Sequence, residues 1–301
     1  MSERPLIVVL HWGVLSQTAA CVASLLAQTA APDLLLIDNG GEPDATSALR
    51  MMAPAARVLR SDTNLGVAAP DLLERLLAAA ERHPSVALLG PKILDIDQPQ
   101  RLVRAGGGSW RRNYLSSAGE LSRKFGRFLP AELALLLDNA RGEGQPDDGR
   151  FDDAPQAGFL TGGAQLIRVE ALKQVGLLDA EFSPYGGEDI EFCARLEQAG
   201  WQLRYVPEAR CFHPGPGSYR DPYRRAFYNT RNMLLLARKR LGGTEFYGRY
   251  LPDLLLVTLP LKLAHAGLAG SSEQLRGITD ALAWTVRDAA ARGIRIRTPR
   301  D

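Results

Sequence analysis

The stretch that decides the fold runs from Gly158 to His213 and reads GFLTGGAQLIRVEALKQVGLLDAEFSPYGGEDIEFCARLEQAGWQLRYVPEARCFH. At its centre, two glycines precede the acidic pair Glu188 and Asp189. Glycine lets the backbone turn tightly and approach a ligand closely, because it carries no Cβ. The pair falls in the first turn of a predicted helix that ends near Gly200, where the helix dipole favours carboxylates. The turn by itself predicts either a catalytic carboxylate pair or an ordinary acidic helix start.

The segments around this turn follow a definite order along the chain. A run of small residues from Thr161 to Ala164 precedes a short apolar strand, and a predicted helix covers Glu170 to Val175. After the acidic turn and its helix, a predicted strand covers Gln202 to Val206 and ends at Pro207, and His213 follows. This order resembles the acceptor half of inverting family 2 glycosyltransferases with a GT-A fold, especially their rhamnosyltransferase-like branch.

The resemblance implies a role for each matching residue. Asp189, with Glu188 beside it, matches the general base that removes a proton from the acceptor hydroxyl. His213 matches a histidine that approaches the diphosphate and its bound metal, which is Mg²⁺ or Mn²⁺ in the family. Arg231 lies in an aromatic–Arg–Asn segment and would reach the diphosphate or else support the local structure. The predicted acceptor-binding residues are Thr161, Gly162, Gly163 and Gly187.

The first part of the chain predicts a layered α/β arrangement. Two continuous β-prone runs, Leu6 to Leu10 and Leu34 to Ile37, are typical of strands buried on both faces of a parallel sheet. Between them, residues 17–28 carry apolar side chains at helical spacing. This order implies a right-handed crossover and an open α/β sheet. Ligands bind beyond the carboxyl ends of the strands in such sheets, and Asp38 lies at such an end.

The same region resembles the nucleotide-binding half of the family. A carboxylate at the end of the second strand would accept hydrogen bonds from ring N–H groups or ribose hydroxyls. The Asp-Asn-Gly-Gly sequence at this point is also a common turn, but the presence of both halves favours the nucleotide site. The predicted nucleotide-binding residues are Leu10, His11, Asp38, Asn39 and Asn64.

The resemblance breaks after Asn64-Leu65-Gly66. In the family, a helix, a central strand and a metal-binding Asp-x-Asp tip follow, whereas this chain passes directly to a predicted helix from Pro70 to Arg82. The missing elements amount to about 25 residues at ordinary element lengths. The strands beside a missing central strand would lose ladder partners on one side. The residues Asp95-Ile96-Asp97 match the Asp-x-Asp pattern of the metal motif. They follow a strand and turn, however, that lie beyond the metal site in the family.

Two functional hypotheses fit this pattern. The first is an inverting glycosyltransferase that moves a sugar such as rhamnose from a dTDP- or UDP-linked donor to a glycan or lipid-linked glycan. The second is a catalytically silent GT-A domain that binds nucleotide, glycan or a partner protein, and the missing Asp-x-Asp favours it. The gap fits a truncated or edited enzyme and a natural degenerate form equally well.

Composition narrows the class of protein. A net charge of +2 argues against a nucleic-acid binder, and 46% hydrophobic with 23% charged residues is typical of a folded protein. Cys21, Cys193 and Cys211 form no CxxC pattern, which suits core residues of a protein in a reducing compartment. The apolar start is too short for a signal peptide, and no run reaches 18 uninterrupted apolar residues. We therefore expect a cytoplasmic protein.

We expect an α/β protein of GT-A type, with an open, mostly parallel sheet flanked by helices and a C-terminal helical tail. The predicted glycosyltransferase domain covers residues 1–240, divided into a nucleotide-binding half at 1–100, an irregular insert at 101–157 and an acceptor half at 158–240. The tail covers 241–301 and ends in arginines. The basic, aromatic insert and the apolar, basic-ended tail suit peripheral attachment to the inner face of the plasma membrane. A solvated insert, and a tail packed on the catalytic domain or on a second subunit of a homo-oligomer, are the alternatives.

Overall fold

The computed structural model describes residues 6–11, 15–28, 32–38, 45–60, 67–69, 71–117, 121, 141–153, 156–184, 186–213 and 221–292. The chain forms two compact units, and both are discontinuous in sequence. The first unit comprises Met1–Gly106, Arg141–Gln174 and Gly200–Ser218, and the second comprises Gly107–Ala140, Val175–Ala199 and Tyr219–Asp301. The predicted domain limits at residues 100, 157 and 240 stay predictions.

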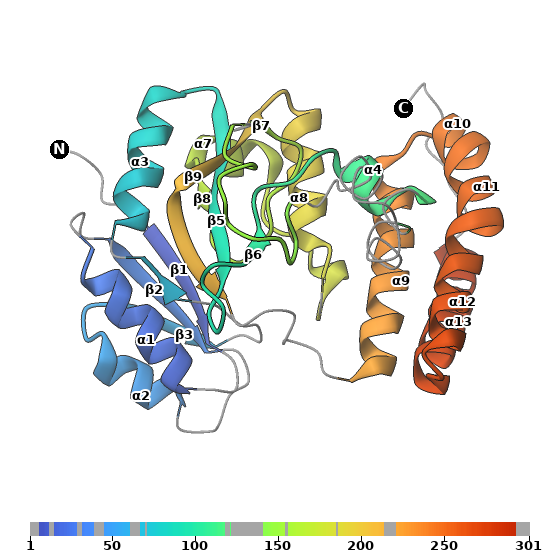
Figure 1. The fold of residues 1–301 in the computed structure, drawn as a ribbon, viewed down its shortest axis with the longest axis horizontal. Helices are drawn as coiled ribbons and strands as arrows, with labels where there is room; N and C mark the ends of the chain where they lie inside the picture. The colour runs from blue at the N-terminus through green and yellow to red at the C-terminus, as the bar shows by residue number, and fades with distance from the viewer. Residues whose placement is uncertain are drawn as a thin grey trace. The chain divides into compact units, whose positions relative to one another are not determined.

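The first unit begins with a three-stranded parallel sheet. Its strands pair in the order β1-β2-β3, and the predicted strands at 6–10 and 34–37 are confirmed. The helices α1 and α2 supply the crossovers between these strands, as the β–α–β pattern predicts (Figure 1). The elements are β1 (Leu6–His11), α1 (Leu15–Leu26), β2 (Asp33–Asp38), α2 (Ala45–Met52) and β3 (Arg57–Arg60).

A second, mixed sheet lies in the same unit. Its central strands β5 and β9 run parallel, and the short strands β4, β6, β7 and β8 pair antiparallel with them (Figure 1). The apolar run at the start of β5 is fully buried. The elements are β4 (Val67–Ala68), α3 (Leu72–Arg82), β5 (Val86–Asp95), β6 (Leu102–Arg104), β7 (Gln156–Ala157), β8 (Leu166–Ile167), α7 (Val169–Val175) and β9 (Gln202–His213).

The strand predicted to end at Pro207 continues to His213, so that prediction is wrong. Proline lacks the N–H that a regular ladder needs and is tolerated at bulges. The pairing of β9 with β5 shifts register after Val206 and resumes at Arg210, so Pro207 falls in the irregular part. Beyond it, the strand carries Cys211 and His213 along β5 to Asp95.

The missing central strand after Gly66 stays a prediction. In the part of the chain that the structure describes, no strand belongs to both sheets, and β1 pairs with β2 alone. Side-chain packing joins the sheets instead, because Val9 and Leu36 lie in the same buried cluster as Leu89, Val206 and Cys211. Cys21 and Cys193 are also buried thiols, as their expected core role requires.

The second unit is helical. The long helices α9 and α13 lie against each other, and a Cβ on Gly277 would meet the carbonyl oxygen of Tyr223 at 2.5 Å, so glycine permits this close approach. The ion pair between Arg238 and Asp288 (2.6 Å) joins the same two helices. The helices predicted near 223–240 and 274–292 are confirmed. The elements are α4 (Trp110–Tyr114), the 3₁₀ turn η2 (Ala180–Phe182), α8 (Glu188–Gln198), α9 (Pro222–Arg240), α10 (Gly243–Glu245), the π-helical turn η3 (Phe246–Tyr250), α11 (Leu251–Asp253), the π-helical turn η4 (Leu254–Thr258), α12 (Leu259–Leu268) and α13 (Ser272–Arg292).

Candidate active site

The acidic turn of the second unit has the backbone geometry that its glycines predict. Gly186 and Gly187 have φ angles of 78° and 98°, a conformation that residues with a Cβ rarely adopt. A Cβ on Gly187 would also meet the ring of Phe182 at 3.2 Å. Helix α8 begins directly afterwards at Glu188. Both features require glycine at position 187.

The two carboxylates that follow have different environments. The Oδ1 atom of Asp189 accepts a hydrogen bond from the backbone N–H of Ile190 at 2.8 Å. Burial, and secondarily the charge of Asp189, raise the pKa of Glu188 to about 7. Burial disfavours the ionised form more strongly here than the helix start favours it. Glu188 is therefore only partly ionised near neutral pH.

Two residues of α9 hold the loop before the acidic turn. The Nδ2 atom of Asn232 donates hydrogen bonds to the carbonyl oxygens of Phe182 (3.0 Å) and Gly186. Arg231 donates through Nη2 to the carbonyl oxygens of Glu181 (3.0 Å) and Ser183 (2.9 Å), and through Nε to Oδ1 of Asn232 (2.7 Å). We call Arg231 and Asn232 the loop clamp. Both side chains are buried.

The side chain of Arg231 contacts two aromatic rings in addition to the loop. Its guanidinium lies 4.9 Å from the ring centre of Tyr228 and 5.4 Å from that of Trp284, in addition to its three hydrogen bonds. These contacts support the loop, which is the alternative that the sequence left open. Contact with a diphosphate stays a prediction.

Further ion pairs attach α8 and the preceding turn to α9. The fully buried carboxylate of Glu191 pairs with Arg195 (2.9 Å) and Arg240 (2.7 Å), and Lys239 pairs with Asp179 (2.5 Å). Breaking a buried pair by removing one partner is strongly destabilising. Sequence reasoning did not identify this network. The i, i+4 spacing of Glu191 and Arg195 was its one visible sign.

The predicted nucleotide-binding residues belong to the first unit. In the ladder of β1 and β2, His11 is the partner of Asp38 and Leu10 is the partner of Ile37, at the carboxyl ends of both strands. The backbone therefore brings His11 and Asp38 together at the sheet edge where ligands bind in open α/β folds. Asn39 and Asn64 lie outside the described residues.

The predicted acceptor-binding residues are divided between the units. Thr161, Gly162 and Gly163 lie in the first unit, whereas Gly187 lies in the second. The small-residue run is positioned by Gln165, whose side chain donates to the carbonyl oxygen of Leu160 at 3.0 Å. A Cβ on Gly163 would lie 3.4 Å from Ile93, so the run packs closely on β5. The role of all four residues in acceptor binding stays a prediction.

His213 ends β9 opposite Asp95, the last residue of β5. The Oδ1 atom of Asp95 accepts hydrogen bonds from the backbone N–H groups of Asp97 (2.8 Å) and Gln98 (3.1 Å), so this carboxylate caps the turn after β5. Among the described residues, no three His, Cys, Asp or Glu side chains are grouped as metal ligands. Mg²⁺ and Mn²⁺ prefer several oxygen ligands. The described residues thus do not fit the expected cation, and the role of His213 at a metal stays a prediction.

Two carboxylates near the end of the insert, Asp147 and Asp152, have a structural role. The ammonium group of the buried Lys92 pairs with Asp147 (2.6 Å) and Asp152 (2.9 Å), and Tyr205 donates to Asp152 at 3.3 Å. Lysine is almost never fully buried unless it is paired. These carboxylates therefore hold the insert to β5.

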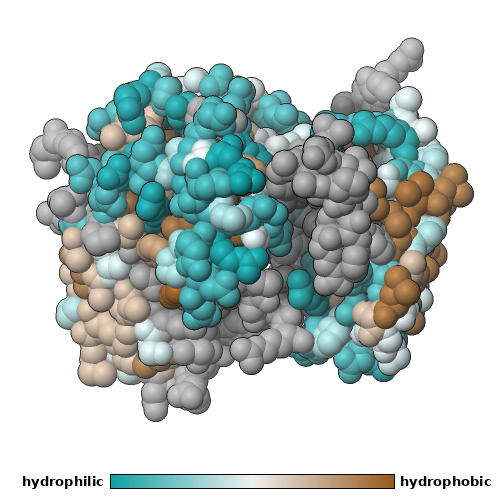
Figure 2. Space-filling model, viewed as in Figure 1, coloured by the Kyte–Doolittle hydropathy of each residue, from teal (hydrophilic) through white to brown (hydrophobic). Residues whose placement is uncertain are grey.

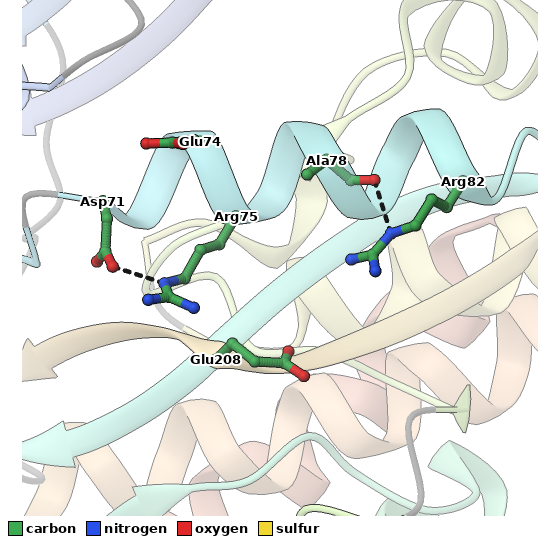
Figure 3. A pocket seen from close by; sticks show the side chains of 6 residues that line it. All are labelled: Asp71, Glu74, Arg75, Ala78, Arg82 and Glu208. Carbon is green, nitrogen blue, oxygen red and sulfur yellow. Dashed lines mark hydrogen bonds and ion pairs between the residues drawn. The ribbon is translucent and has the colours of Figure 1, made fainter.

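A polar hollow of about 430 Å³ lies between α3 and the irregular part of β9 (Figure 3). Its ion pair between Arg75 and Asp71 (2.6 Å) is exposed to water, where such pairs contribute little. The hollow contains no predicted site residue, and its lining mixes both signs of charge. Its lining residues are Asp71, Glu74, Arg75, Ala78, Arg82 and Glu208.

Comparison with known proteins agrees with the predicted fold. Residues 148–286 match the family described as Glycosyl transferase family group 2. An N-acetylglucosaminyl-diphospho-decaprenol L-rhamnosyltransferase of Mycobacterium tuberculosis, found in strains CDC 1551 / Oshkosh and ATCC 25618 / H37Rv, is 28% identical, and the alignment covers 73% of this chain and 80% of the relative. A mannosyltransferase from Pyrobaculum calidifontis, solved with GDP-Man and Mn²⁺, has a similar fold with a TM-score of 0.50 and 13% identity, over 98% of this chain and 82% of that chain.

The fold is that of a GT-A glycosyltransferase, as the sequence predicted. The chain resembles the rhamnosyltransferase-like glycosyltransferases of family 2, and this resemblance is confirmed by the family match and by the mycobacterial relative. A nucleotide sugar and a divalent cation occur together in the related structure from Pyrobaculum calidifontis.

Proposed function

We propose that this chain is an inverting glycosyltransferase that moves a sugar from a nucleotide-diphosphate donor to a lipid-linked acceptor at the inner face of the plasma membrane. The pair of carboxylates at the start of α8, held by the loop clamp, is the observation that carries the proposal. The sugar is L-rhamnose and the acceptor a diphospho-lipid sugar, by analogy with the mycobacterial relative. A dTDP- or UDP-linked donor is expected from the family resemblance.

Asp189 is the general base in this proposal. Its carboxylate accepts the proton of an acceptor hydroxyl while that oxygen attacks the anomeric carbon from the face opposite the diphosphate. The bond between the anomeric carbon and the diphosphate oxygen breaks, its electron pair leaves with the nucleotide, and the new glycosidic bond has inverted configuration. Assistance of this kind contributes about 10²–10⁴-fold to the rate.

Glu188 limits the charge of the site. Because its pKa is about 7, it retains a proton over part of the neutral range, and the pair then has one ionised member. One ionised carboxylate is enough to accept one proton. A second charge would raise the proton affinity of Asp189, since neighbouring carboxylates disfavour each other's ionisation. Glu188 therefore tunes the base in this mechanism.

Donor binding is assigned to the strand ends of the first unit. Leu10, His11 and Asp38 lie side by side along β1 and β2, and Asn39 and Asn64 are expected to complete the nucleotide site. Thr161, Gly162 and Gly163 of the first unit and Gly187 of the second stay the predicted acceptor-binding residues. No step is assigned to Mg²⁺ or Mn²⁺, because the described residues do not gather the oxygen ligands that such a cation needs.

The test pairs Asp189→Asn with Asp97→Asn, which removes an exposed carboxylate outside the proposed machinery. We expect Asp189→Asn to abolish transfer while the affinity for dTDP or UDP, measured by calorimetric titration, stays nearly unchanged. Asp97→Asn should retain activity, which would also show that the sequence Asp95-Ile96-Asp97 is not the metal motif. Loss of nucleotide binding in folded Asp189→Asn protein would contradict the proposed base.

The same titration distinguishes the second hypothesis, a silent GT-A domain, from the active enzyme. Repeating it with Mn²⁺, with Mg²⁺ and with a chelator shows whether binding of the diphosphate needs a cation. Wild-type protein that binds nucleotide but transfers no sugar to any acceptor would be the silent GT-A domain. A wild-type protein that binds neither dTDP nor UDP would contradict the enzyme hypothesis, because the donor site would be absent.

A further inference from the structure

The helical run from Gly243 to Leu268 in the second unit has two different faces. Its inward face includes Tyr250 and Leu254, which are buried. Its other face exposes large apolar side chains, with Leu256 76% and Leu268 82% exposed, and it forms a brown region on that unit (Figure 2). The run is long and apolar enough in composition to cross a membrane. Contiguous apolar surface of this kind marks an interaction site in a folded protein.

The acidic residues of the run are held by other groups of the second unit. Glu245 pairs with Arg111 at 2.5 Å and with Arg249 at 3.8 Å. Asp253 accepts hydrogen bonds from the backbone N–H of Ser117 (2.8 Å) and from the hydroxyls of Ser117 (2.6 Å) and Thr258 (2.9 Å). Arg249, whose side chain is 64% exposed, is the single charged residue among the exposed residues of the run. The exposed face is therefore apolar with a positive charge.

This combination fits a lipid surface better than water or a second copy. An amphipathic helix with Leu and aromatic side chains on one face lies in the interface of a bilayer, and anionic lipids attract its basic residues. A symmetric pair of these faces would instead bring identical cationic residues together. A spanning arrangement would place the hydrogen-bonded Asp253 and the ion-paired Glu245 in hydrocarbon, which is costly. The run thus has the features of a helix that lies on a membrane.

We propose that the exposed face of Gly243–Leu268, centred on Leu255 and Leu256, is a docking surface for an anionic lipid bilayer. Its length of roughly 39 Å, at about 1.5 Å per residue, provides an extended contact. The biological role of this surface rests on the proposed function, because a lipid-linked acceptor is held in a membrane. The binding itself depends on the apolar and cationic side chains of this face.

The experiment is cosedimentation of the full chain with vesicles of phosphatidylcholine and phosphatidylglycerol in equal parts. Leu255→Glu/Leu256→Glu should weaken binding by on the order of tenfold or more, because it removes two apolar side chains and adds two negative charges. The matched control is Leu26→Glu/Met51→Glu, which makes the same change at exposed positions of α1 and α2 and should bind as the wild type does. Arg249→Ala should weaken binding to these vesicles by about fivefold and leave binding to pure phosphatidylcholine unchanged.

Wild-type protein that does not bind these vesicles, or a Leu255→Glu/Leu256→Glu variant that binds normally, would overturn the proposal. Analytical ultracentrifugation provides the other refutation: a wild-type dimer that this variant converts to a monomer would assign the face to a second copy. Transfer to a short-chain, water-soluble acceptor should be equal in the wild type and in both double variants. If none of them transfers sugar but the vesicle result holds, the proposed function fails and the docking surface is still supported.

Discussion

The titration of Glu188 should make the stability of the folded protein fall as the pH rises. Burial and the charge of Asp189 raise the pKa of Glu188 from 4.5 to about 7. The folded state therefore binds a proton that the unfolded state releases between about pH 4.5 and 7. At about 1.4 kcal/mol for each tenfold change in proton affinity, ionised Glu188 lowers the free energy of unfolding by about 3 kcal/mol above this window.

Glu188→Gln removes this ionisation and keeps the shape of the side chain. We expect the variant to be more stable than the wild type by about 3 kcal/mol at pH 8 and by less than about 1 kcal/mol at pH 5, because the penalty is fully present only above the folded pKa. Urea unfolding at the two pH values measures both differences. The control is Glu170→Gln, since Glu170 is an exposed carboxylate in the first turn of α7.

An equal stability difference at pH 5 and pH 8 would refute the reasoning, because a change in packing alone does not depend on pH. A Glu170→Gln control with the same pH dependence would refute it as well, since burial would then not be the cause. Glu188→Gln should also lower activity despite its greater stability. A residue that lowers the stability of the folded protein at a site is typical of a functional residue.

Two more substitutions test the parts of the structure that hold the site and the insert. Lys92→Met should destabilise the first unit by about 3 kcal/mol in urea unfolding, because it leaves Asp147 and Asp152 without their cation. Asn232→Asp should lower kcat by on the order of tenfold with little change in nucleotide affinity, because a carboxylate oxygen would then face the carbonyl oxygen of Gly186 and displace the catalytic loop.

Each of these substitutions has a control in the same chain. Lys173→Met changes an exposed lysine of α7 and should leave stability unchanged, and Asn229→Asp makes the same change at an exposed position of α9. Unaltered stability of Lys92→Met would mean that the buried ion pair does not hold the insert. If Asn232→Asp keeps full kcat, or loses nucleotide affinity in parallel, the loop clamp does not position the base.

The elements predicted well from the sequence were those with a strong local signal. The two apolar runs in β1 and β2 could form little else than buried strands, and the glycines before Glu188 required a turn whatever surrounded them. Among the described residues the two sheets share no strand, which agrees with the segment expected to be missing after Gly66. The extent of β9 was predicted wrongly, because a local rule about Pro207 was applied without the bulge that accommodates it.

The contacts that support the site were not predictable in the same way. Arg231 reaches carbonyl oxygens about 50 residues away in the chain, and Lys92 reaches carboxylates at a similar separation. Nothing in the residues around either cation specifies these partners, because the pairing depends on how α9 and β5 are packed. The mixed lining of the hollow beside Glu208 likewise arises only when α3 lies along β9.

The sequence by itself predicted the GT-A fold and the position of the acidic turn. These are properties of residue order, which local backbone preference and apolar patterning express directly. Only the tertiary structure decided that burial raises the pKa of Glu188 to about 7, and that the buried Arg231 supports the loop before the acidic turn. The physical reason is that desolvation and hydrogen-bond partners are set by segments distant in the chain, and these come together only when the helices pack.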